Sequence, residues 1–229
     1  IMDVPADPIH PMSDSGHALH ATSPLIPPLS WIGDRGVCVQ TGDATLPRYA
    51  QLLSGEYAEL EDVIPADGTL LLVLRRGASL SAALHEALSA PLDATPSLQP
   101  LTHTIKVRYG GDAGPDLVQL AEQAGLDAAS FVTRHCAAEY TVAFLGFQPG
   151  FPYLRGLPQA LQAPRRATPR VHVPAGSVAI GGAYTGIYPA DGPGGWHIIG
   201  RTTAVMFDPN RPEPALLLPG DLVRFVADD

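Results

Sequence analysis

Lysine is almost absent from this 229-residue chain, which has 14 basic and 23 acidic side chains and only one lysine, Lys106. The formal net charge is -9. Proteins that bind nucleic acid through its phosphates present clustered positive charge, and a chain with this balance offers little of it. The composition therefore argues against a nucleic-acid partner.

Cysteine is also scarce, since the chain has only Cys38 and Cys136. Without a C-x-x-C motif or a Cys/His spacing, these two residues build neither a disulfide framework nor a zinc site, so we expect reduced thiols and no metal centre. Long apolar runs are missing as well, because TLLLVL at 69–74 is far shorter than the ~20 residues that span a membrane, and no signal-peptide pattern is present. We therefore expect a cytoplasmic protein.

Glycine and proline, by contrast, are abundant, at 23 and 24 residues, and their placement divides the chain. Residues 1–24 lack apolar periodicity, so we expect a flexible leader. Residues 25–95 predict a small α/β domain, and breaker residues at 90–100 indicate its boundary. The expected strands lie in 29–40 and 69–74, and the expected helices in 45–54 and 79–89.

The second predicted domain covers residues 96–229. It opens with a strand at 103–109, two helices and a strand at 139–147; we expect Gly125 to cap the end of the first helix and Asp127 the start of the second. Short strand-like runs separated by Gly and Pro then follow at 171–182, 185–189, 196–200, 202–208 and 221–227. This pattern predicts a closed barrel or sandwich and an α+β fold class for the whole chain.

Arginine is concentrated in one part of the sequence. Between Tyr140 and Pro212 the only carboxylates are Asp191 and Asp208, yet this segment holds six arginines: Arg155, Arg165, Arg166, Arg170, Arg201 and Arg211. The planar guanidinium group suits recognition of carboxylate or phosphate. Either these arginines bind an anion, or distant acidic residues of the first domain pair with them, or water solvates them.

Two further groups of residues allow both a functional and a structural interpretation. His135 and Glu139 flank a helix-to-strand transition, where an imidazole near a carboxylate can act as an acid/base pair. Alternatively, they cap the end of the helix, where a cationic histidine is favoured. Phe147, Phe151 and Tyr153 either pack in the core or form the wall of a pocket.

Several ordered segments carry a family resemblance: GFQPGFPYLRGL, APRRATPRVHVPAGSVAIGG, TGIYP, PGGWHIIGRT, MFDP and LLPGDLVRF, with YGGDAGPDLVQLAEQAGL and HCAAEYTVAFLGF upstream. From about residue 28 onward the chain resembles the family of 5-oxoprolinase B subunits, also called allophanate hydrolase subunit 1. The resemblance implies a small α/β N-terminal domain followed by a cyclophilin-like β-barrel of the carboxyltransferase type.

The resemblance also implies a chain that does not act alone. In that family it works with a lactam-utilisation protein (the A type) and with a homologous second barrel subunit (the C type). The complex opens 5-oxo-L-proline to L-glutamate in an ATP-dependent reaction, with ATP and magnesium as the implied cofactors.

Related proteins imply alternative functions. One is a regulator that inhibits a sensor histidine kinase, and another is half of a urea- or allophanate-type carboxyltransferase. The chain itself has no biotin-attachment signal, because its only lysine lies in TIKVR rather than beside Met. Prolyl isomerisation, by analogy with cyclophilins, rests on the fold alone.

We therefore predict half of a binding site on the barrel face formed by residues 146–170 and the TGIYP and PGGW turns. The expected holders of a substrate carboxylate or a phosphorylated intermediate are Arg165, Arg166, Arg170 and Arg201. The residues expected to exclude water around the anion are Phe147, Phe151, Tyr188 and Trp196. His135 and Glu139 are the candidate acid/base residues.

Overall fold

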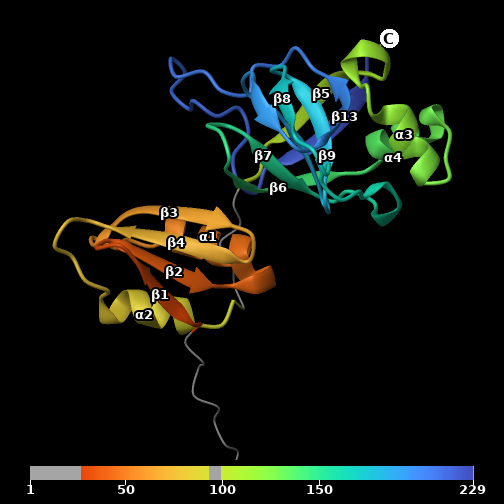
Figure 1. The fold of residues 1–229 in the computed structure, drawn as a ribbon. Coiled ribbons are helices and arrows are strands. Elements are labelled where there is room, and N and C mark those ends of the chain that lie inside the picture. Colours follow the sequence, from red (N-terminus) through yellow and green to blue (C-terminus); the bar gives the residue numbers. More distant parts are fainter. Residues whose placement is uncertain (1–26, 93–98, 229) are drawn as a thin grey trace, which may run out of the picture.

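The computed structural model describes residues 27–92 and 99–228 (Figure 1). The predicted leader at 1–24 and the centre of the predicted boundary at 90–100 lie outside the described residues. The described chain forms two units, a four-stranded sheet with two helices and a larger barrel with two helices at its side (Figure 1). No described helix has the length and apolar character needed to cross a membrane.

The first unit is an antiparallel sheet in the order β1-β2-β4-β3, flanked by two helices. Its elements are β1 (Leu29–Ile32), β2 (Gly36–Gln40), the 3-10 turn η1 (Gly42–Ala44), α1 (Thr45–Ser54), β3 (Leu60–Ala66), β4 (Thr69–Leu74) and α2 (Ala82–Ser89). Leu70, Leu72 and Leu74 alternate along β4 and are fully buried in the core of this unit. The predicted helices and the strand at 69–74 are confirmed, whereas the run 29–40 forms two strands, β1 and β2, separated by a turn. Strand β3 was missed because Pro65 and its acidic residues weaken the strand pattern.

The second unit is a closed barrel of seven strands in the order β10-β7-β6-β13-β5-β12-β9. Its barrel strands are β5 (Thr102–Tyr109), β6 (Tyr140–Leu145), β7 (Pro152–Arg155), β9 (Ser177–Gly181), β10 (Tyr184–Ile187), β12 (His197–Arg201) and β13 (Leu222–Ala227). Its other elements are η2 (Gly111–Ala113), α3 (Leu117–Gln123), α4 (Ala128–Ala137), η3 (Gln159–Leu161) and the two-stranded ribbon of β8 (Arg170–Val173) and β11 (Gly192–Gly194). The predicted α+β class and barrel are therefore confirmed.

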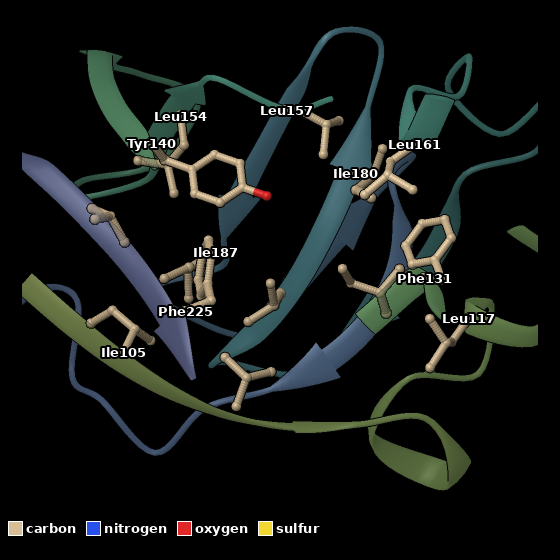
Figure 2. Close-up of a cluster of buried hydrophobic side chains, with 14 of the residues drawn as sticks. Ile105, Leu117, Phe131, Tyr140, Leu154, Leu157, Leu161, Ile180, Ile187 and Phe225 are labelled. Atoms are coloured by element: carbon tan, nitrogen blue, oxygen red, sulfur yellow. The ribbon is translucent and has the colours of Figure 1, made fainter. Parts of the chain in front are cut away.

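The barrel interior is filled by aliphatic and aromatic side chains (Figure 2). Along β5, Ile105 and Val107 point into this core, whereas Lys106 and Arg108 are exposed on the outer face. This alternation follows from the strand geometry, in which successive side chains point to opposite faces. Burial of each large apolar side chain stabilises the fold by about 1.5–3 kcal/mol.

The predicted helix ends are confirmed, whereas one predicted strand is wrong. The Asp127 carboxylate accepts a hydrogen bond from the Ser130 amide at 2.6 Å, and Gly125 has a left-handed φ of 66°. Residues 202–208 form no strand. Here the Ala204 amide donates to the Thr202 hydroxyl at 3.2 Å, so a local turn replaces a strand pairing.

A hydrogen bond joins the two units. The Tyr184 hydroxyl, on β10 of the barrel, donates to the carboxylate of Asp67 at 2.6 Å, in the turn between β3 and β4. This bond is exposed, so it contributes little to stability.

Candidate functional site

The loop between β6 and β7 holds Phe147 in a strained backbone conformation. Its φ is 66°, in the left-handed region that bulky residues rarely adopt. Its ring is 60% exposed and meets the rings of Phe151 and Tyr188 edge to face, with centroids 5.5 and 6.2 Å away. Such strain costs about 1–3 kcal/mol and clusters at functional sites. The loop thus presents an aromatic ring to solvent at an energetic cost.

Behind Phe147 lies a buried group of aromatic rings. Phe151 contacts Tyr188 and Trp196 edge to face, with centroids 5.1 and 5.4 Å away. Two glycines make room for these rings, since a Cβ atom on Gly181 would lie 2.5 Å from the Trp196 ring and one on Gly194 would lie 2.3 Å from the Tyr188 hydroxyl. Gly181, at the end of β9, and Gly194, at the end of β11, therefore make the packing of the aromatic wall possible.

The rings enclose a cavity of about 190 Å³, which we call the aromatic cavity. Six of its ten lining residues were predicted for the site: Phe147, Phe151, Arg165, Arg166, Tyr188 and Trp196. Tyr153, for which the sequence left open core packing or a pocket wall, also lines this cavity. The structure thus brings the aromatic residues together with two of the four predicted anion holders.

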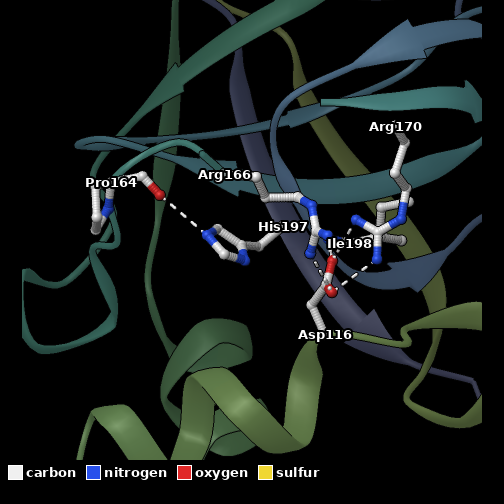
Figure 3. Close-up of polar contacts among 6 residues, drawn as sticks. All are labelled: Asp116, Pro164, Arg166, Arg170, His197 and Ile198. Atoms are coloured by element: carbon white, nitrogen blue, oxygen red, sulfur yellow. Dashed lines mark hydrogen bonds and ion pairs between the residues drawn. The ribbon is translucent and has the colours of Figure 1, made fainter. Parts of the chain in front are cut away.

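Beside this cavity, a buried carboxylate binds two of the predicted arginines (Figure 3). Both terminal nitrogens of Arg170 donate to Asp116, each at 2.8 Å, and Arg166 Nη1 donates to the same carboxylate at 3.0 Å. The Ile198 amide supplies a fourth hydrogen bond at 2.7 Å. We call this arrangement the Asp116 clamp. It corrects the prediction for Arg166 and Arg170, whose charges are compensated in part.

The sequence pointed to distant acidic residues of the first domain as alternative partners of these arginines, so Asp116, which lies in the second domain, was missed. Asp116 precedes α3, some 50 residues before Arg166. Burial alone would raise the pKa of the Asp116 carboxyl group, but the hydrogen bonds from Arg170 and the Ile198 amide outweigh it, so the pKa lies below its usual range. Asp116 therefore stays charged and fixes both guanidinium groups.

Positive charge still exceeds negative charge at the aromatic cavity. Asp116 supplies one negative charge to Arg166 and Arg170, while Arg165 lines the cavity with no hydrogen-bond or ion-pair partner among residues 27–92 and 99–228. The Nε atom of Arg166 is buried and also lacks a partner within the described chain. An unsatisfied buried donor costs about 1–3 kcal/mol, and such groups are rare in folded proteins. The cavity is therefore suited to an anion.

The predicted acid/base pair is wrong, because the structure separates its two residues. His135 is fully buried, with Nδ1 hydrogen-bonded to the Tyr109 hydroxyl at 2.8 Å and Nε2 to the Thr185 hydroxyl at 3.2 Å. Burial lowers the pKa of His135 to about 3, so the imidazole is neutral. Glu139 lies on the surface, where its carboxylate accepts a hydrogen bond from Arg224 at 2.6 Å. Neither residue lines the aromatic cavity.

Arg201 does not join the other predicted anion holders. Its Nε donates to the Ala175 carbonyl at 3.0 Å, and its side chain lines a different cavity. Five residues of extended strand carry it roughly 15 Å beyond Trp196. The structure therefore divides the four predicted arginines between two cavities and the Asp116 clamp.

Comparison with known proteins identifies relatives of this chain. The family model "Carboxyltransferase domain, subdomain C and D" matches residues 28–217. The chain is 48% identical over 167 residues to the B subunit of 5-oxoprolinase from Escherichia coli O157:H7, an alignment that covers 72% of this chain and 77% of that protein.

Solved structures show the same fold. TTHA0988 superposes with a TM-score of 0.72 at 36% identity, covering 85% of this chain. The chain spans only 40% of the length of TTHA0988. The Kluyveromyces lactis urea carboxylase superposes with a TM-score of 0.65 over 88% of this chain and 22% of its own, and at 19% identity this likeness concerns the fold alone.

Proposed function

Because the chain belongs to the family of the carboxyltransferase domain, subdomains C and D, in which it is similar to the 5-oxoprolinase B subunit, we propose that it forms part of an ATP-dependent 5-oxoprolinase. The reaction opens the lactam ring of 5-oxo-L-proline to give L-glutamate. The partners are a lactam-utilisation protein of the A type and a homologous second barrel subunit. The observation that supports this function is the aromatic cavity with its excess of positive charge.

The aromatic cavity suits a small cyclic acid. Its volume of about 190 Å³ is below the range of about 300–1,000 Å³ that is typical for drug-sized ligands, so it fits a smaller molecule. Arg165 and the exposed part of the Arg166 guanidinium group would hold the substrate carboxylate, while Phe151 and Trp196 would pack against the apolar part of the ring. In a site with little water, these charges bind an anion more strongly than they would in solution.

The chemistry of ring opening requires groups that the aromatic cavity does not supply. None of its ten lining residues carries a carboxylate, an imidazole or a thiol. Burial raises the pKa of the Tyr188 hydroxyl, so this group stays protonated and serves as a hydrogen-bond donor rather than a base. Hydrolysis of a lactam needs a base for water and an acid for the leaving nitrogen. We infer that the partner subunits supply them and that this chain binds and orients the substrate.

ATP is a proposed substrate of the complex, and magnesium would accompany it. Magnesium in such sites is held largely by phosphate oxygens and water, together with one or two carboxylates. Among the described residues no group of three or more His, Cys, Asp or Glu side chains lies at metal-binding distance. The ion would therefore reach the complex with the nucleotide, and carboxylates of the partners would complete its coordination.

The test is reconstitution of the three-protein complex and measurement of 5-oxoproline-dependent ATP hydrolysis and of glutamate. The informative variant is Arg165→Gln, because Arg165 has no partner among the described residues and its replacement leaves the Asp116 clamp intact. Loss of a charged hydrogen bond worth about 1.5–3 kcal/mol predicts a KM for 5-oxoproline that rises roughly tenfold to a hundredfold. The control is Arg134→Gln, an exposed arginine on α4 that lines neither cavity. An unchanged KM in Arg165→Gln would remove the proposed role of the cavity.

A carboxyltransferase component is the second candidate function, and the matching family model favours it. In that case the reconstituted complex would transfer a carboxyl group from carboxylated biotin to urea, and 5-oxoproline would not stimulate ATP hydrolysis. Measuring both reactions with the same preparation separates the two functions.

A further inference from the structure

A second cavity, of about 450 Å³, opens on the outer face of the barrel. Three cationic side chains line it: Lys106, Arg108 and Arg201. We call it the cationic cavity. Its lining residues are distinct from those of the aromatic cavity, so a ligand bound there does not depend on the proposed lactam chemistry.

The strand geometry explains why the three cations lie together. Lys106 and Arg108 are two residues apart on β5, so both side chains point to the same outer face. Arg201 on the neighbouring antiparallel strand β12 lies directly opposite Arg108 in the register. Side chains of such cross-strand partners are close neighbours, with Cβ atoms about 4.5–5.5 Å apart.

Two like charges opposite each other destabilise a sheet unless something compensates them. Among residues 27–92 and 99–228, Arg108 has no hydrogen-bond or ion-pair partner, and Arg201 uses only its Nε, to the Ala175 carbonyl. Among the described lining residues the single carboxylate belongs to Asp228, which lies 4.0 Å from the exposed Lys106 ammonium. The described lining thus keeps an excess of positive charge in a chain whose net charge is -9.

The opposite wall of the cationic cavity is held in place by backbone hydrogen bonds. The Thr202 amide donates to the Gly176 carbonyl at 2.9 Å, and the Gly176 amide donates to the Tyr188 carbonyl at 2.8 Å. The wall is therefore a fixed part of the barrel, and the cavity does not depend on a loose loop. Pro189 lines this cavity, whereas the preceding Tyr188 lines the aromatic cavity, and the two cavities share no lining residue.

We propose that the cationic cavity is a phosphate-binding site, in which the paired guanidinium groups of Arg108 and Arg201, together with Lys106, bind the oxygens of a phosphoryl group. A phosphate dianion would neutralise the two opposed arginines and offers several acceptor oxygens to their N–H groups. The phosphoryl group belongs either to free phosphate or to a nucleotide.

Isothermal titration calorimetry of the purified chain at low ionic strength, with inorganic phosphate and separately with ATP, tests this site. Low salt is needed because the three cations are exposed and their interactions are screened. Arg108→Gln is the cleanest variant, because it removes no hydrogen bond within the described chain. It should weaken binding about tenfold, as expected when one charged contact to phosphate is lost. Arg134→Gln should leave binding unchanged.

A second variant is expected to strengthen binding, which distinguishes an effect on the site from a loss of folding. Asp228→Asn removes the negative charge at the cavity and should strengthen phosphate binding about threefold, an effect typical of one exposed charge. If ATP binds more tightly than phosphate and its binding depends on Arg108, the ligand is a nucleotide. If phosphate binds more tightly than ATP and depends on Arg108, the ligand is free phosphate. If neither ligand binds, or if Arg108→Gln and Asp228→Asn bind like the unmodified chain, the proposal is overturned. Arg165 is not part of this cavity, so this result is independent of the 5-oxoproline assay.

Discussion

Arg170 binds Asp116 through both terminal guanidinium nitrogens, each 2.8 Å from a carboxylate oxygen. Asp116 itself is only 4% exposed, so the pair is shielded from water and the geometry of the guanidinium group is fixed. The same carboxylate binds Arg166, which lines the aromatic cavity. Asp116, the residue that precedes α3, therefore determines the position of the Arg166 guanidinium group at the candidate site.

Replacement of this carboxylate should destabilise the fold. In Asp116→Asn the two arginines lose their counter-charge while remaining largely buried, and the loss of one partner of such a pair costs about 3 kcal/mol or more. Urea unfolding monitored by tryptophan fluorescence measures the change in the free energy of unfolding. In the control, Asp112→Asn on the exposed turn before α3, the free energy of unfolding should stay within about 0.5 kcal/mol of that of the unmodified chain. Equal stability of both variants would show that the clamp contributes nothing.

The buried His135 predicts a pH dependence of stability. Its folded-state pKa of about 3 lies below the unfolded value of about 6.5, so between these values the unfolded chain binds the additional proton. The free energy of unfolding therefore falls as pH falls below about 6.5. The stabilisation linked to His135 is fully present only above that pH. In His135→Gln, which keeps a neutral polar side chain, this part of the decrease should disappear. A matched replacement of the partly exposed His85 should retain it, and identical pH profiles for all three proteins would contradict the prediction.

Phe147 allows stability and function to be separated. Glycine adopts a φ of 66° without strain, so Phe147→Gly should unfold at the same urea concentration as the unmodified chain or at a higher one. The variant also removes the ring at the mouth of the aromatic cavity, so the KM for 5-oxoproline should rise in the reconstituted complex. Phe147→Ala should show the same KM without the relief of strain. Unchanged kinetics in both variants would assign the exposed ring another role.

Two adjacent glycines make a matched pair of variants. A Cβ atom at position 194 would lie 2.3 Å from the Tyr188 hydroxyl, whereas one at position 195 would find its nearest neighbour, Pro169, at 3.8 Å. Gly194→Ala should therefore displace the Tyr188 ring and cost about 1–3 kcal/mol, while Gly195→Ala should be tolerated. Thermal unfolding compares them, and equal melting temperatures would mean that the aromatic wall adapts.

Local signals in the sequence predicted much of the fold. The Asp127 cap, the short apolar run at 69–74 and the repeated breakers after residue 146 led to the correct helix start, a correct strand and the barrel. These features depend on neighbouring residues, so they can be recognised without the tertiary structure. The segment 202–208 was misjudged because β-branched residues favour a strand, whereas the Thr202 side chain stabilises a turn.

The candidate site could be predicted only in part. The aromatic residues and Arg165 lie in segments that carry the family resemblance, so the sequence and the resemblance together grouped them. The ion pair of Asp116 with Arg170 joins residues 54 positions apart, and no local pattern indicates it. Likewise, the burial of His135 depends on strands that approach α4 from other parts of the chain.

The strand order of the barrel has a consequence for its synthesis. Strand β13 lies between β5 and β6, parallel to one and antiparallel to the other, although these strands precede it by many residues. On the ribosome the nascent barrel is therefore an open sheet, with β5 and β6 unpaired along facing edges, until residue 227 has emerged. The sheet of β1 to β4 is made of contiguous strands and can fold well before that moment.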